Sequence, residues 1–178
     1  MPINKNLPFA LSGIAMAMLS AQAQGQSVCA PGSYDEPPLD GICLAASVGS
    51  YVPDAGATAA ILADPGHFVS IEGAVEQTIA AAGTYVSGTG ASAATLAGIG
   101  TFVASAGATT ATQAALGSFV NTTGATVATL ADPGSFVDTT GASSAQLAAP
   151  GTFVSSAGAS AATEAAPGYF VSDAGATA

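Results

Sequence analysis

From Gly32 onward the chain repeats one arrangement of apolar, small and polar residues every 17 positions, without an insertion or a deletion. Counting from the opening glycine of each unit, position 3 is aromatic, position 4 is valine in every unit after the first, and positions 8 and 9 are then Gly-Ala. Such a fixed period predicts an array whose small units are stabilised by stacking on their neighbours. Units 1 to 9 open at Gly32, Gly49, Gly66, Gly83, Gly100, Gly117, Gly134, Gly151 and Gly168.

Each unit predicts a strand, a turn, a second short segment and a corner. An aromatic residue followed by a β-branched one, as at Phe102-Val103, predicts a short strand. The glycine at position 8 is expected to adopt a positive φ in the turn. The second segment favours an extended strand because threonine recurs at position 13 and proline closes four units; one turn of helix, capped for example by Ser92, is the alternative.

The sequence therefore predicts an all-β repeat protein with an elongated shape, and two arrangements satisfy the period. In a β-solenoid each unit is one coil rising about 4.8 Å, which gives a rod of roughly 40 Å. In an array of stacked short hairpins each unit advances further, which gives a longer and more flexible stalk. In both, the aromatic row is expected to form the main apolar spine, because each buried ring contributes roughly 1.5 to 3 kcal/mol. The row comprises Tyr34, Tyr51, Phe68, Tyr85, Phe102, Phe119, Phe136, Phe153 and Phe170.

The first 23 residues have the three parts of a secretory signal peptide. Lys5 supplies the positive charge, residues 7–19 form an apolar run too short to span a bilayer, and Ala21-Gln22-Ala23 is a cleavage signature. We expect a mature, exported chain that begins near Gln24, with an N-terminal capping unit at 24–48 and the tandem repeats at 49–178. The ninth unit stops at its position 11, so we expect the natural chain to continue beyond Ala178.

Charge narrows the choice of partners. Lys5 is the only Lys or Arg, and all 11 acidic residues follow it from Asp35 onward, so the mature chain is purely anionic. It lacks the cations that neutralise phosphates, which argues against binding nucleic acid, and an anionic membrane surface would repel it. Its fold is expected to rest on backbone hydrogen bonds, apolar packing and turns.

Cys29 and Cys43 are the only cysteines, and export predicts a disulfide between them that caps the N-terminal end. In the repeat frame Cys43 occupies position 12 of unit 1, and Cys29 occupies position 15 of the frame before it. Later units carry alanine at position 15, and at position 12 with the one exception of Gln77.

The segment Cys29-Ala30-Pro31-Gly32-Ser33-Tyr34, with Cys43 following, resembles the ephrin-receptor-like GCC cysteine repeats, and the units from Gly49 onward resemble the same frame without cysteines. The resemblance implies extracellular β-hairpin modules that serve as stalks or ligand-facing rods and catalyse no reaction. Cysteine-poor arrays of this kind are similar to those of secreted, often surface-anchored bacterial proteins, which suits a bacterial source.

Few residues offer chemistry. His67 is the sole histidine, and Asp64 and Ser70 lie too near it in sequence to build a nucleophilic triad. The acidic residues follow no fixed register, which argues against calcium sites, and we expect no catalytic, cofactor-binding or metal-binding residue and no small-molecule substrate. Asn121-Thr122-Thr123 is a glycosylation sequon.

These features predict a secreted or cell-surface structural protein, not an enzyme, that acts as a stalk, a spacer or an adhesive or assembly module. Open ends and small apolar strands favour self-association, and an extracellular protein or carbohydrate is the other expected partner. The alternative is a binding module that presents rows of Ser and Thr at positions 10 and 13 to ice or carbohydrate.

Overall fold

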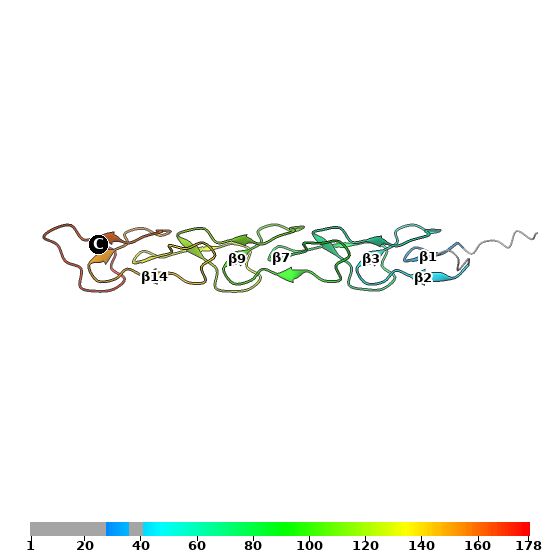
Figure 1. Ribbon diagram of the computed structural model, residues 1–178, viewed down its shortest axis with the longest axis horizontal. Helices are drawn as coiled ribbons and strands as arrows, with labels where there is room; N and C mark the ends of the chain where they lie inside the picture. The colour runs from blue at the N-terminus through cyan, green and yellow to red at the C-terminus, as the bar shows by residue number, and fades with distance from the viewer. Residues whose placement is uncertain (1–27, 36–40) are drawn as a thin grey trace, which may run out of the picture.

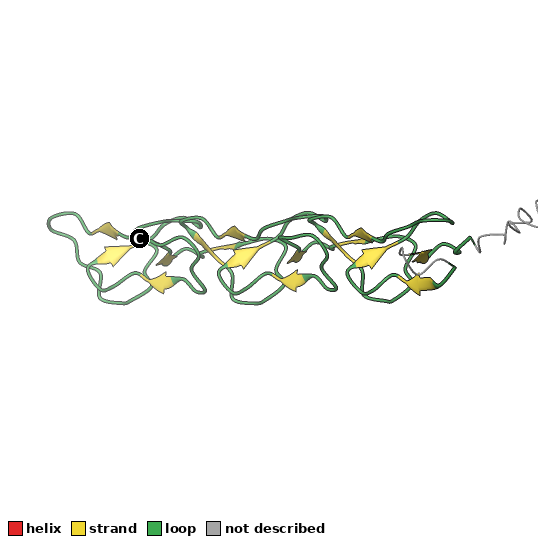
Figure 2. Cartoon of the chain, turned by 45° about the vertical axis from the view of Figure 1, so that its right-hand side comes forward, coloured by secondary structure: helices red, strands yellow, loops and turns green. Residues whose placement is uncertain are grey.

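A computed structural model describes residues 28–35 and 41–178 of the chain. These residues form a long, thin rod with a succession of hairpins along it (Figure 1). Within them there is no helix, and the strands pair antiparallel in eight two-stranded sheets (Figure 2). The predicted signal peptide lies outside the described residues.

Each of the first eight units contributes one hairpin of two short strands. The strands are β1 (Ser33–Asp35), β2 (Cys43–Ala45), β3 (Ser50–Tyr51), β4 (Ile61–Leu62), β5 (His67–Phe68), β6 (Thr78–Ile79), β7 (Thr84–Tyr85), β8 (Thr95–Leu96), β9 (Thr101–Phe102), β10 (Thr112–Gln113), β11 (Ser118–Phe119), β12 (Thr129–Leu130), β13 (Ser135–Phe136), β14 (Gln146–Leu147), β15 (Thr152–Phe153) and β16 (Thr163–Glu164).

The register is the same in the seven hairpins from unit 2 to unit 8. Position 2 faces position 14 and position 3 faces position 13, as in Ser50 opposite Leu62 and Tyr51 opposite Ile61. The second segment of the unit is therefore a strand, as favoured, and the one-turn helix is wrong. The first strand covers positions 2 and 3, where the sequence predicted 3 and 4, because the valine at position 4 bonds the next unit instead of its own hairpin.

Two glycines per unit make the turns. The glycines at positions 1 and 8 have positive φ in every unit after the first, for example 80° at Gly100 and 75° at Gly107. The turn at the corner is closed by a bond from the position 2 amide to the position 16 carbonyl of the preceding unit, as from His67 to Asp64 at 3.0 Å. Glycine as the third residue of this turn, often after proline, has the composition of a type II turn.

Backbone hydrogen bonds join each of units 1 to 7 to the two units that follow it. The Gly66 amide donates to the Val86 carbonyl at 2.8 Å, and the Val86 amide donates to the Ala108 carbonyl at 3.0 Å; both bonds link adjacent units. The Gly107 amide donates to the Ala80 carbonyl at 2.8 Å and so links units two apart. The same three bonds recur along the array.

This network decides between the two predicted arrangements. Strands pair within a unit and not between units, so the β-solenoid is wrong and the stacked hairpins are confirmed. The hairpins are nevertheless not independent of one another, because backbone hydrogen bonds join each of them to its neighbours.

The core is narrow and consists of valine and alanine. Fully buried side chains occupy positions 4 and 15, whereas the aromatic row is only half-buried through Phe153, and Phe170 in the last unit is 88% exposed. The apolar spine is thus the valine and alanine row, not the aromatic row that the sequence suggested. The buried row comprises Ala46, Val52, Ala63, Val69, Ala80, Val86, Ala97, Val103, Ala114, Val120, Ala131, Val137, Ala148 and Val154.

We expect Gly117→Ala to destabilise the rod more than Gly151→Ala. Both glycines open a unit with φ of 78° and 86°, so alanine pays a similar backbone cost of about 1–2 kcal/mol at each. A methyl group at Gly117 would collide with the carbonyl of Gly158, whereas one at Gly151 meets nothing within 4 Å. Thermal unfolding followed by circular dichroism compares the two; equal losses in the midpoint temperature would contradict the close approach of these units.

Candidate functional site

The predicted disulfide is present at the N-terminal end of the described array. Cys29 and Cys43 are bonded, with their Cα atoms 5.5 Å apart. Cys29 is buried like the alanines at position 15 of later units, and its carbonyl accepts the Gly56 amide at 2.8 Å, as the Ala46 carbonyl accepts the Gly73 amide. Cys29 therefore continues the buried row and its hydrogen bonds one unit further, and the bridge ties that row to β2.

The hydroxyls at position 2 are structural. Their O–H groups donate to the carbonyl that also accepts their own amide, at position 16 of the preceding unit. This bond fixes the corner turn and leaves these hydroxyls unavailable as a binding row. The donors are Ser33, Ser50, Thr84, Thr101, Ser118, Ser135 and Thr152.

The hydroxyls at positions 10 and 13, by contrast, are exposed wherever Ser or Thr occurs there. Position 13 is a strand residue opposite the aromatic residue, as Thr129 is opposite Phe119. Successive hairpins face different sides of the rod (Figure 2), so these rows wind around it.

His67 lies apart from any catalytic arrangement. Its ring Nδ1 is 3.4 Å from the Pro65 carbonyl oxygen, next to its own corner turn. Asp64 is engaged elsewhere: its amide donates to Gln77 Oε1 at 2.7 Å and its carboxylate accepts Gln77 Nε2 at 2.8 Å. This pair of hydrogen bonds was not predicted, although Gln77, the exception to alanine at position 12, was its signal in the sequence.

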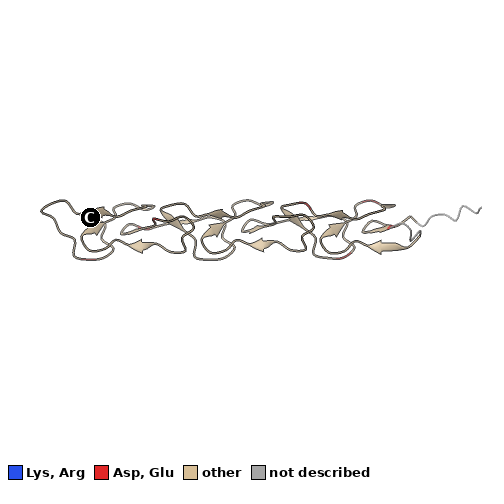
Figure 3. Ribbon diagram, viewed as in Figure 1, with Lys and Arg blue, Asp and Glu red and all other residues tan. Residues whose placement is uncertain are grey.

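The charges of the described residues are all negative and spread along the rod (Figure 3). Among these residues no three His, Cys, Asp or Glu side chains lie close enough together to hold a metal ion. Asn121, at position 5 of unit 6, is exposed.

Leucine and isoleucine lie on the outside of the rod. Every one of them in the described residues except the half-buried Leu44 is exposed, including Leu62, Leu96 and Leu130 at position 14. Each of these three side chains also lies against the glycine at position 8 two units later, as Leu62 lies against Gly90. The larger aliphatic side chains therefore lie on the outer surface, whereas the core contains the smaller valine and alanine.

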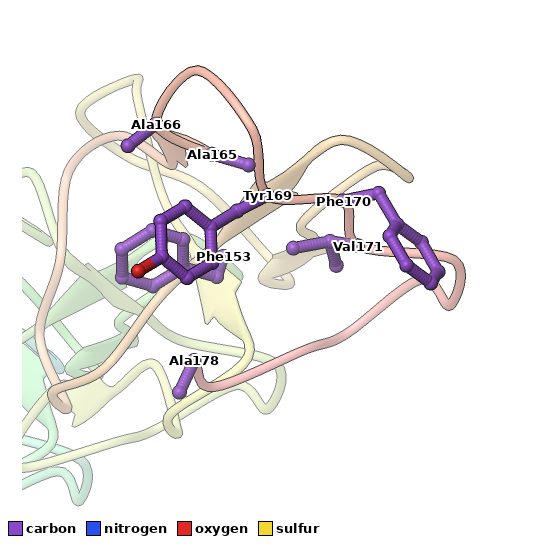
Figure 4. A pocket seen from close by; sticks show the side chains of 7 residues that line it. All are labelled: Phe153, Ala165, Ala166, Tyr169, Phe170, Val171 and Ala178. Atoms are coloured by element: carbon purple, nitrogen blue, oxygen red, sulfur yellow. The ribbon is translucent and has the colours of Figure 1, made fainter.

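A pocket of about 460 Å³ lies in the last two units, between Phe153, Ala165, Tyr169 and Val171. Figure 4 shows Phe170 pointing away from the other aromatic rings. In the interior of the rod the corresponding space is covered by following units, since each position 1 amide and position 15 carbonyl bonds a later unit. The pocket thus reflects the place of these units in the array and carries no argument for a ligand.

A second pocket of about 220 Å³ lies in unit 3. Buried Val69 and Ala74 line it together with exposed Ile71, Val75 and Glu76. Here a change in the pattern of the units coincides with a hollow in the surface.

No protein-family model matches the sequence, and no curated protein matches it. Among the described residues the structure has no helix with the length and hydropathy that crossing a membrane requires. The functional proposal therefore depends on the residues and their geometry.

Replacing both cysteines with alanine is expected to loosen the N-terminal units only. Alanine already fills both positions in the later full units except for Gln77 in unit 3, and losing a 15-residue loop closure costs at most about 3 kcal/mol. In an array with neighbour-to-neighbour coupling, the amides of Gly32 and Gly49 should exchange hydrogen faster while that of Gly117 is unchanged. Hydrogen-exchange mass spectrometry checks this; a uniform change along the rod would argue against a local cap.

We expect Ser118→Ala to lower the stability of the rod by about 0.5–1.5 kcal/mol. Its hydroxyl is nearly buried and donates to the Ala115 carbonyl at 2.8 Å. Ser143→Ala, which removes an exposed hydroxyl at position 10, should have no measurable effect. Denaturant unfolding of the two variants makes the comparison, and a loss of equal size in both would refute the structural role of position 2.

Proposed function

We propose that this chain is an exported structural repeat protein that acts as a stalk, spacer or assembly module outside the cell. The observation that carries the proposal is the backbone network that bonds each unit to the next two along the described array. Such a network fixes each unit relative to its neighbours, so the rod can keep its shape without a bulky core. We assign the chain no enzymatic step, no cofactor and no small-molecule substrate.

Export is supported by the signal sequence at residues 1–23 and agrees with the disulfide, since disulfides persist in oxidising compartments. The resemblance of residues 29–43 to extracellular GCC repeats, and of the later units to cysteine-poor bacterial arrays, favours a bacterial cell surface or its surroundings. Determining the N-terminal residue of the secreted protein tests the export step, with Gln24 expected.

The surface constrains the partners. Because the mature chain has no Lys or Arg, we expect neither nucleic acid nor an anionic membrane to bind it. An extracellular protein, a carbohydrate or another copy of the chain remains as a partner. The strands are only two or three residues long, and short edges limit uncontrolled edge pairing, so assembly would depend on side chains.

The exposed hydroxyls at positions 10 and 13 favour a second function, the binding of carbohydrate or ice. An ice-binding face needs hydroxyls in one plane, whereas successive hairpins here face different sides of the rod (Figure 2). The rod therefore suits a spacer better than an ice-binding face. Thermal-hysteresis measurement on the mature chain tests the ice-binding alternative, and activity there would replace the spacer proposal.

Deleting units 5 and 6 is expected to shorten the rod in proportion to the number of units lost. Removing residues 100–133 joins Ile99 to Gly134 and keeps the phase of the repeat, and duplicating the same residues should lengthen the rod by the same increment. Small-angle X-ray scattering measures both, with a maximum dimension of the parent protein well above the roughly 40 Å of a solenoid.

A flexible string of hairpins would give a different result. Its average span grows only as about the square root of chain length. Square-root scaling across the three lengths, or a compact particle, would refute the rod and the spacer role with it.

A further inference from the structure

Unit 3, residues 66–82, departs from the repeat more than any other unit that carries the full pattern. At position 10, Val75 is the only residue without a hydroxyl in units 2 to 9, and at position 12, Gln77 is the only residue other than alanine in units 2 to 8. In units 2 to 9, Ile71 is the only large apolar residue at position 6, and Glu76 is the only charged residue at position 11.

These departures gather around one pocket. Ile71 is 66% exposed and Val75 47% exposed, and they line the hollow of about 220 Å³ together with the buried Val69 and Ala74. Glu76 lines the same hollow and supplies its only charge.

The backbone around the pocket is the ordinary one. The Val69 amide donates to the Ala91 carbonyl at 3.0 Å and the Gly73 amide to the Ala46 carbonyl at 2.8 Å. Unit 5 makes the same two bonds at the same lengths from Val103 and Gly107. Among the side chains that line the pocket, those at positions 5, 6, 10 and 11 differ between the two units; in unit 5 they are Ala104, Ser105, Thr109 and Thr110.

Glu76 has no Lys or Arg to pair with in the described part of the chain. The neighbouring Gln77 is held by both its amide oxygen and its amide nitrogen to Asp64, which fixes the chain beside Glu76 and occupies the Asp64 carboxylate. The pocket thus combines four apolar side chains, the hydroxyl residues Ser70 and Thr78 and one negative charge without a Lys or Arg partner.

We propose that this pocket receives a lysine or arginine side chain from a basic, apolar segment of another exported protein. The space is smaller than the roughly 300–1,000 Å³ of small-molecule sites, and so fits a single side chain. The aliphatic stem of a basic side chain packs against Ile71 and Val75 while its charged end meets Glu76, the division that such side chains adopt at apolar surfaces. This docking role adds to the spacer function and does not depend on it.

A peptide titration tests the chemistry of the occupant. The ¹⁵N-labelled mature chain is titrated with acetyl-Gly-Leu-Lys-Leu-Gly-amide and with two matched peptides in which norleucine or glutamate replaces lysine. We expect saturable shifts confined to the amides of residues 69–78 with the lysine peptide, at least tenfold weaker binding with norleucine, and none with glutamate. Added salt should weaken the lysine complex, because an exposed ion pair is screened.

A swap between units provides the matched control. The triple change Ile71→Ser, Val75→Thr and Glu76→Thr gives unit 3 the residues that unit 5 carries on the same backbone, and should abolish the shifts. The reverse change in unit 5, Ser105→Ile, Thr109→Val and Thr110→Glu, should create a second responding region at residues 103–112. The reverse graft keeps the test decisive even where the first variant fails to fold.

Several outcomes would overturn the proposal. These are the absence of saturable shifts, equal binding of the three peptides, shifts spread evenly over all units, or shifts that survive the triple change. Shifts that grow with protein concentration alone and vanish in the triple variant would identify a second copy of the chain as the occupant. None of these results bears on the length scaling of the rod, so the docking site and the spacer role fail independently.

Discussion

The close approach of two backbones from units two apart is the contact on which the rod depends. The glycine at position 1 lies so near the position 8 carbonyl of the second following unit, as Gly100 lies near Gly141, that a methyl group would not fit. The position 8 amide meanwhile bonds a position 15 carbonyl two units back, as Gly141 bonds Ala114 at 2.8 Å. Both glycines also have positive φ. The backbone conformation and, at position 1, the lack of space for a Cβ atom therefore both require glycine.

This closeness explains the unusual distribution of apolar residues. Backbones that nearly touch leave room between them only for small side chains, which is why valine and alanine are buried while leucine and isoleucine are exposed. A core of this kind contributes little apolar area per unit, and the regular bonds between units make up for it. Reliance on backbone hydrogen bonds also suits a chain that has no Lys or Arg for salt bridges after residue 5.

Local features of the fold were predictable from the sequence, and features between units were not. The period, the strand at residues such as Thr95-Leu96, the turn at Gly56 and the Cys29–Cys43 bridge follow from residue types and short spacings. Whether strands pair within or between units does not, because a 17-residue period is compatible with both. The prediction that the aromatic row forms the spine was wrong for the same reason. The size of the rings favours burial, but no local pattern encodes the contact between units two apart. That contact makes the core too narrow for the rings, which therefore lie at its edge.

Some positions of the repeat hold the units together and others do not, and this difference determines where sequence variation can add a function. The bonds between units use the backbone at positions 1, 4, 8, 9 and 15, and the row of buried valine and alanine side chains lies at positions 4 and 15. Positions 6, 7, 10 and 11 hold no part of that network, so their side chains can change without disturbing the rod. Unit 3 changes at these positions and keeps the same hydrogen bonds as unit 5. A repeat array built in this way can therefore bear a local binding site in one unit while the others remain uniform spacers.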